Sequence, residues 1–179
     1  MKFISQKIDG LVLIIPDVFE DDRGTFRRNF CSKELRAKGI NMSVCQGNIS
    51  ENISAYTMRG FHYQKNPSDE AKILTPISGV IYNVVIDLRK SSPTFLKSVA
   101  LEVSSFRRET LHVPAGCANA FLTTVANTVV QYYMGDYFKS ETYAGFRYND
   151  PYFSIHWPHV PMVISDRDAS FPNFSLSDL

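Results

Sequence analysis

Three side chains suited to acid–base chemistry lie in aromatic-rich segments of this sequence. His62 stands between two aromatic residues in MRGFHYQ, residues 58–64, Lys72 follows ten positions later, and Tyr132 opens the segment YYMGDYF. Histidine is the usual general base near neutral pH because its unperturbed pKa is about 6.5, and a tyrosine hydroxyl can act as the acid. Lys72 and Arg59 could stabilise negative charge. The alternative is that His62 only packs, since a lone histidine in an apolar strand is more often a satisfied core residue.

Metal binding is another interpretation of His62, and the residue spacing argues against it. Double-sheet barrels often hold a metal through two histidines one residue apart, but His62 and His112 each lack such a neighbour, and His156 and His159 flank Trp-Pro near the end of the chain. The three cysteines have no zinc-type spacing and form no even set that would indicate a disulfide framework. We therefore expect no metal site and a reducing compartment.

The composition indicates an ordinary globular protein. The chain has 179 residues, 44% hydrophobic and 21% charged, without repeats or linkers, so we expect a single domain over residues 1–179. A net charge of +1 gives no support for a nucleic-acid partner. No apolar run is long enough for a signal peptide or a membrane span, which favours a soluble, cytoplasmic protein without membrane partners.

Short runs rich in Val, Ile, Thr, Tyr and Phe, separated by Gly, Pro, Asn and Asp, predict a mainly β fold, namely a sandwich, jelly roll or barrel. Only Ser32–Gly39 reads as a helix, with Ser32 as its N-cap, and a second short helix is expected near the C-terminus. The predicted strands are Leu11–Pro16, Gly24–Phe30, Ser43–Ser50, Ala55–Tyr63, Ala71–Pro76, Gly79–Arg89, Ser98–Ser104, Glu109–Pro114, Ala118–Thr124 and Thr128–Tyr137.

Two of these strands make further predictions. Gly79–Arg89 is apolar on both alternating faces, so it should be buried on both sides, and the polar Asn83 within it needs a hydrogen-bond partner. In residues 58–64, strict alternation would put Arg59 and His62 on opposite faces. A bulge or twist around Gly60 would bring both to one site.

Ten short motifs follow one another along the chain, namely DDRGTF (21–26), QGNIS (46–50), MRGFHYQ (58–64), EAKIL (70–74), IYNVVIDLRKSSPTF (81–95), VPAGCANAF (113–121), YYMGDYF (132–138), GFRYNDP (145–151), IHWP (155–158) and SDRDASFP (165–172). In this order they resemble the dTDP-4-dehydrorhamnose 3,5-epimerase family of nucleotide-sugar enzymes. The resemblance implies a jelly roll of the cupin type, a homodimer and no cofactor. It implies inversion of C5, C3 or both in a nucleotide-linked 4-keto-6-deoxy sugar, through an enolate, in deoxysugar or surface-polysaccharide synthesis.

The resemblance also implies roles for individual residues. His62 would be the base, Tyr132 the acid on the opposite face of the sugar, and Lys72 the group that stabilises the enolate. The substrate-binding residues would surround them. They are Arg23 and Arg59 at the sugar and diphosphate, Gln46 and Asn48 on the nucleotide side, Phe26 and Phe138 as packing or stacking groups, Asn83 and Asn119 near the sugar, and Arg167 and Asp168 in the C-terminal motif.

The sequence departs from the family pattern at several of these positions. The family usually has aspartate where Asn83 stands, and we expect that position to pair with the catalytic histidine, which would leave His62 a weaker base here unless another carboxylate substitutes. Asn119 replaces a histidine. Arg28 and Tyr143 replace glutamates on the nucleotide side, which suggests altered recognition of the base.

These departures keep other functions open. The chain could be a single-site epimerase, acting at C3 or at C5 only, on a CDP- or GDP-linked sugar. It could also be a non-catalytic cupin that binds a sugar nucleotide, although a bare binding module has no need of His62, Lys72 and Tyr132 together. A 3,4-ketoisomerase fits the motifs less well.

Overall fold

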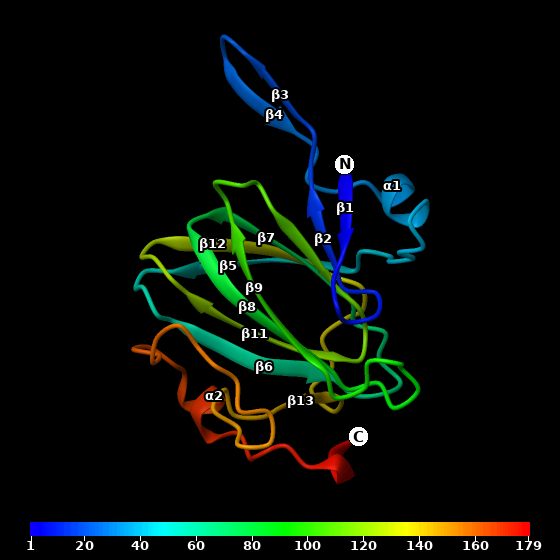
Figure 1. Cartoon of the computed structure of the whole chain (residues 1–179), viewed down its shortest axis with the longest axis vertical. Coiled ribbons are helices and arrows are strands. Elements are labelled where there is room, and N and C mark those ends of the chain that lie inside the picture. The colour runs from blue at the N-terminus through cyan, green and yellow to red at the C-terminus, as the bar shows by residue number, and fades with distance from the viewer.

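The computed structural model describes residues 1–179 and consists of two packed antiparallel sheets with a projecting hairpin (Figure 1). One sheet has the strand order β1-β2-β10-β7-β12-β5, the other has the order β13-β6-β11-β8-β9, and β3 pairs with β4 alone. The elements are β1 Lys2–Ser5, β2 Val12–Ile15, β3 Val18–Asp21, β4 Gly24–Arg27, α1 Ser32–Arg36, β5 Gln46–Asn52, β6 Met58–Gln64, β7 Lys72–Ser78, β8 Val80–Asp87, β9 Ser98–Ser104, β10 Thr110–Val113, β11 Cys117–Thr123, β12 Thr128–Met134, β13 Tyr143–Gly145, α2 Asp166–Ser170 and η1 Leu176–Asp178.

The apolar core fills the space between the two sheets. Leu74, Leu111 and Val130 of the six-stranded sheet pack against Ile81 and Phe121 of the five-stranded sheet. Because side chains alternate along a strand, the opposite face of the five-stranded sheet needs its own cover. The C-terminal segment, orange to red in Figure 1, lies against that face. β8 is therefore buried on both sides, as its sequence predicts.

The inward side chains change from apolar to polar at one end of the sandwich. On β12 they pass from Val130 to Tyr132, and on the paired strand β7 they pass from Leu74 to Lys72. Polar residues of β5, β6 and β11 also point between the sheets there. Packing polar side chains together without water or hydrogen-bond partners is unfavourable. This end of the sandwich therefore holds a cavity instead of a packed apolar core.

A β-bulge interrupts β6 in the middle of this polar region. β11 pairs Asn119 with His62 but pairs Phe121 with Arg59, so two residues of β6 face a single residue of β11. Gly60 has a φ of 106°, and a Cβ built on it would lie 2.5 Å from the carbonyl oxygen of Asn119. The bulge brings Arg59 and His62 to the same face, and both line one cavity. The expected irregularity at Gly60 is confirmed.

The mainly β prediction is confirmed, and each predicted strand overlaps an observed one. The short strands β1, β3 and β13 lie outside the predicted strands. The expected helix ends at Arg36, and its N-cap is Cys31 rather than Ser32. The predicted C-terminal helix corresponds to α2. No helix has the length and apolar character needed to cross a membrane.

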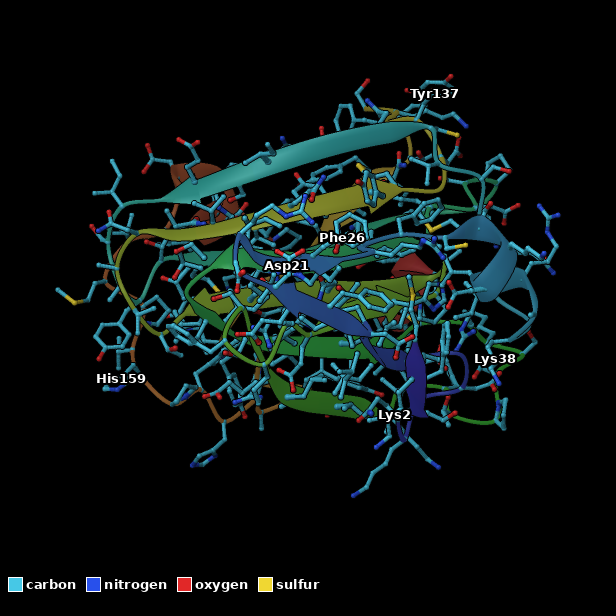
Figure 2. All side chains as sticks on the ribbon, turned by 90° about the horizontal axis from the view of Figure 1, so that it is seen from above. Lys2, Asp21, Phe26, Lys38, Tyr137 and His159 are labelled. Carbon is cyan, nitrogen blue, oxygen red and sulfur yellow. The ribbon has the colours of Figure 1, made fainter.

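The β3–β4 hairpin extends beyond both sheets (Figure 1). Figure 2, seen from above, shows Asp21 and Phe26 on this projecting arm. Phe19 and Phe26 pair across the hairpin and are 66% and 68% exposed as whole residues. Solvated pairs of large aromatic residues are unusual on a monomer surface and often mark an interaction site.

The bulge predicts a large difference between two glycine substitutions. Gly60→Ala should lower the free energy of unfolding by roughly 2–4 kcal/mol, because it combines positive-φ strain with a backbone clash. Gly24→Ala is the matched control, since Gly24 has a φ of 117° but nothing within 4 Å of the added Cβ. It should cost about 1–2 kcal/mol from strain alone. Urea denaturation of both variants measures this, and equal losses would contradict the packing argument.

Candidate active site

A cavity of about 340 Å³ opens between the sheets at the polar end of the sandwich. Both sheets contribute strands to its walls, and Phe138 of the loop after β12 and Arg167 of α2 also line it. Its lining residues are Gln46, Asn48, Ser50, Arg59, His62, Glu70, Lys72, Leu74, Asn119, Phe121, Tyr132, Met134, Phe138, Tyr143 and Arg167.

His62 is held by a carboxylate from the far end of the chain. Its Nε2 lies 2.8 Å from Oδ1 of Asp168, which is the first buried residue of α2. The other oxygen, Oδ2, accepts a hydrogen bond from the backbone N–H of Gly60 at 3.0 Å. The Ser165 hydroxyl accepts from the backbone N–H of Asp168 and so fixes the first turn of α2. One carboxylate therefore binds both the histidine and the bulge that turns it inward.

The environment of Asp168 sets the protonation of the pair. Burial alone would raise the pKa of this carboxyl, but the hydrogen bond with His62 and the hydrogen bonds from Gly60 and Ser165 hold it below its usual value. An ionised carboxylate only accepts hydrogen bonds, so Nε2 of His62 carries the proton. Nδ1 has no partner in the chain and is not a buried atom, which leaves its lone pair open to the cavity.

Tyr132 approaches the cavity from the opposite sheet. It lies on β12 between Asn48 of β5 and Leu74 of β7, and its hydroxyl makes no hydrogen bond within the chain. Burial raises the pKa of Tyr132, and the charge of Glu70 raises it further, while Arg59 opposes the shift. The phenol is thus protonated at neutral pH and available as a proton donor.

Lys72 forms a buried ion pair with Glu70. Their Nζ and Oε1 atoms are 2.7 Å apart, with side chains 13% and 4% exposed. The buried Gln64 of β6 donates to the other Glu70 oxygen at 2.6 Å and to the carbonyl of Tyr137. Lys72 therefore enters the cavity in a fixed position with its remaining N–H groups free. Strand alternation could not place Glu70, because it lies two residues before β7 begins at Lys72.

The remaining cations lie at the mouth of the cavity. Arg59 is oriented by a 2.8 Å hydrogen bond from its Nε to Oδ1 of Asn52. Arg167 lies over the ring of Tyr143, with its guanidinium carbon 4.2 Å from the ring centroid. The Tyr143 ring contacts Phe138 edge-on at a centroid distance of 5.3 Å. Positive charge and aromatic faces thus converge where an anionic, ring-containing ligand would enter.

The structure corrects the expectation for Asn83. This residue is fully buried on β8 and does not line the cavity, and its Oδ1 accepts from Nδ2 of Asn119 at 2.9 Å. His62 has its carboxylate in Asp168, which the sequence had placed only among the substrate-binding residues. The replacement at position 83 therefore does not deprive His62 of a carboxylate. Asn119, by contrast, does line the cavity as expected.

Other expected residues divide between the cavity and the hairpin. Gln46 and Asn48 line the cavity from β5, and Gln46 also accepts from the backbone N–H of Phe138 at 2.6 Å. Arg23 and Phe26 lie on the projecting β3–β4 hairpin, outside the cavity of the same chain. The sequence also missed Ser50, Met134 and Phe121, whose inward orientation follows only from strand register.

Together these groups can carry out a two-sided proton transfer. A base with an open nitrogen stands on one sheet, a protonated phenol stands on the other, and a fixed ammonium lines the same cavity. Such a set can remove a proton from carbon beside a carbonyl, stabilise the enolate oxygen, and return a proton to the opposite face.

Comparison with known proteins agrees with this geometry. The family model described as dTDP-4-dehydrorhamnose 3,5-epimerase matches residues 5–175. The chain is 34% identical to the dTDP-4-dehydrorhamnose 3,5-epimerase of Sinorhizobium fredii, over 97% of this chain and 89% of the relative. The Bacillus anthracis enzyme, solved with TDP and PPi bound, superposes with a TM-score of 0.93 at 36% identity, covering 97% and 99% of the two chains.

The Legionella pneumophila enzyme, solved in complex with dTDP-4-keto-L-rhamnose, has a TM-score of 0.88 at 28% identity, covering 97% and 98%. These neighbours share the jelly-roll arrangement of the two sheets and span nearly the whole chain. The protein therefore belongs to the dTDP-4-dehydrorhamnose 3,5-epimerase family and is a nucleotide-sugar epimerase, an isomerase of deoxysugar biosynthesis.

Proposed function

We propose that this chain inverts C5, C3 or both in a nucleotide-linked 4-keto-6-deoxy sugar, with His62 as base and Tyr132 as acid. The observation that carries the proposal is their placement on opposite sheets of one cavity, with the base oriented by Asp168. Inversion needs proton removal from one face of the carbon and proton delivery to the other. A single base would return the proton to the face from which it came.

The reaction begins at the open Nδ1 of His62. The C–H beside the C4 ketone is acidic because the carbanion delocalises onto the carbonyl oxygen as an enolate. Nδ1 takes this proton, and the Asp168 carboxylate stabilises the imidazolium through Nε2. Lys72, fixed by Glu70, donates to the enolate oxygen in the half-enclosed cavity, where water competes less than in bulk solvent.

Tyr132 completes the inversion. Its hydroxyl has no partner in the chain and its raised pKa keeps the proton in place until the enolate forms. Proton transfer from Tyr132 to the far face of the carbon gives the inverted centre. The phenolate then takes a proton from solvent and the His62 imidazolium releases its proton to solvent, which restores the starting state. The nearby Arg59 guanidinium stabilises the transient phenolate.

Substrate binding uses the charged and aromatic mouth of the cavity. Arg59 and Arg167 suit the diphosphate, and the rings of Phe138 and Tyr143 suit a nucleobase. The TDP bound to the Bacillus anthracis enzyme supports a nucleoside diphosphate donor. The donor base is left open among dTDP, CDP and GDP, because Arg28 and Tyr143 depart from the family pattern.

We also propose that two copies of this chain form a homodimer and act in the cytoplasm. Arg23 and Phe26 lie on the projecting hairpin, so they can reach a ligand only in the cavity of a second copy. Two exposed phenylalanine rings on the same arm give such a contact an apolar surface. The proposal involves no cofactor.

The decisive experiment is incubation of the purified protein with dTDP-, CDP- and GDP-linked 4-keto-6-deoxy sugars in deuterium oxide. We expect deuterium at C5, C3 or both for at least one donor, read by NMR, and inverted product at the labelled carbon. His62→Ala should abolish labelling at every position. A folded wild-type protein that labels none of the donors would refute catalysis and favour a sugar-nucleotide-binding role.

Two substitutions test whether the carboxylate partner of His62 is Asp168, as observed, rather than a group at position 83, as the sequence suggests. Asp168→Asn should lower kcat by about 10²–10⁴-fold, because an amide cannot stabilise the imidazolium. Asn83→Asp, the contrasting variant, should not raise the rate, because the new carboxylate would face Asn119 rather than His62. A rate increase in Asn83→Asp, or an unchanged rate in Asp168→Asn, would contradict the assignment.

Asp168→Asn should also change how the free energy of unfolding depends on pH. Because the folded-state pKa of Asp168 is depressed, its stabilising contribution is present above the ordinary aspartate pKa and is lost as pH falls through the folded value. Wild type should therefore be more stable than Asp168→Asn at pH 7, and the two should converge in acid. Thermal unfolding across pH measures the difference.

A further inference from the structure

Asn119 stands directly beside the proposed base. It is the register partner of His62 on the adjacent antiparallel strand, and side chains so paired lie on one face with Cβ atoms about 5 Å apart. Both residues line the cavity, while Asn119 as a whole is 6% exposed. Any sugar placed against His62 therefore also meets Asn119.

The orientation of the Asn119 amide is fixed by the neighbouring strand. Nδ2 donates to the backbone carbonyl of Val84 at 3.1 Å and to Oδ1 of Asn83 at 2.9 Å. A backbone carbonyl can only accept, so rotating the amide would bring two oxygens together. The amide nitrogen of Asn119 must therefore point into the sheet.

The other polar atom of this amide, Oδ1 of Asn119, faces the cavity. Oδ1 of Asn119 accepts no hydrogen bond from the chain, yet the only buried side-chain polar atom without a partner is Nδ2 of Asn83. Oδ1 of Asn119 is thus open to the cavity that its residue lines. It is an acceptor with no capacity to donate, and an amide does not titrate.

Asn83 maintains this arrangement at a cost. Its Oδ1 must face Asn119 to accept, which leaves its own Nδ2 buried and unpaired. An unpaired buried donor destabilises a folded protein because it has lost its hydrogen bonds to water. This cost is consistent with a pair retained for the orientation that it gives Asn119 rather than for stability.

We propose that Asn119 is a specificity-determining residue, whose Oδ1 accepts a hydrogen bond from the sugar hydroxyl on C3 or on the neighbouring C2. The proposal rests on the function proposed above. A hydroxyl can donate to this oxygen, whereas a methylene, a methyl group or a ketone cannot. A sugar lacking that hydroxyl leaves the amide oxygen desolvated and unpaired, so the site selects against it.

The test compares substrates as well as variants. Deuterium incorporation is measured as kcat/KM for the parent sugar nucleotide and for its 2-deoxy and 3-deoxy analogues. Wild type should disfavour one analogue by at least about 10-fold. Asn119→Ala and Asn119→Ser should reduce that ratio to below about threefold, since neither side chain reaches the sugar. A general loss of activity would lower all three rates and leave the ratios unchanged.

The outcomes separate this inference from the proposed function. A wild type that labels the parent sugar but treats both analogues like the parent overturns the role of Asn119 alone. Variant ratios equal to those of wild type overturn it as well. If both variants fail to fold, the wild-type ratios decide. A wild type inactive on every parent donor would instead remove the proposed function itself.

Discussion

The hydrogen bonds of the Asp168 carboxylate hold the site together. One oxygen meets His62 and the other meets the backbone N–H of Gly60, so a residue of α2 fixes both the histidine and the bulge in β6. Without the bulge, Arg59 and His62 would face opposite sides of the sheet. The same carboxylate determines which imidazole nitrogen is protonated and which is open to the cavity. Position, orientation and protonation of the base thus share one cause.

The two sheets give the base and the acid different surroundings. His62 is hydrogen-bonded to the charged Asp168, whereas the Tyr132 hydroxyl has no hydrogen-bond partner in the chain. Burial and the charge of Glu70 favour the neutral form of Tyr132. The ionised carboxylate also stabilises an imidazolium, which prepares His62 to gain a proton. Opposite roles therefore follow from environment rather than from residue type alone. The spacing between the sheets, set by the apolar core beside the cavity, determines that the two groups face one ligand.

Strand content and the main site residues follow from the sequence because their signals are local. Alternating apolar residues mark β8, and collinear motifs place His62, Lys72 and Tyr132 in one family pattern. The partner of His62 could not be found in this way. Asp168 is distant in sequence, and its approach depends on the path of the C-terminal segment across the sheet. Glu70 lies before β7 begins, so strand alternation could not place it beside Lys72. The remoteness of Arg23 and Phe26 from the cavity likewise depends on the three-dimensional path of the hairpin.

In the proposed mechanism, His62 removes a proton from one face of the sugar and Tyr132 delivers a proton to the other. Tyr132→Phe in deuterium oxide tests these separate roles most directly. Removing the acid should leave proton abstraction by His62 intact, so deuterium should still enter the substrate with retained configuration while inversion slows by about 10²-fold or more. Tyr133→Phe is the matched control, because Tyr133 is the next residue on β12 and lies outside the cavity lining. Exchange and inversion that fall equally in Tyr132→Phe would contradict the account.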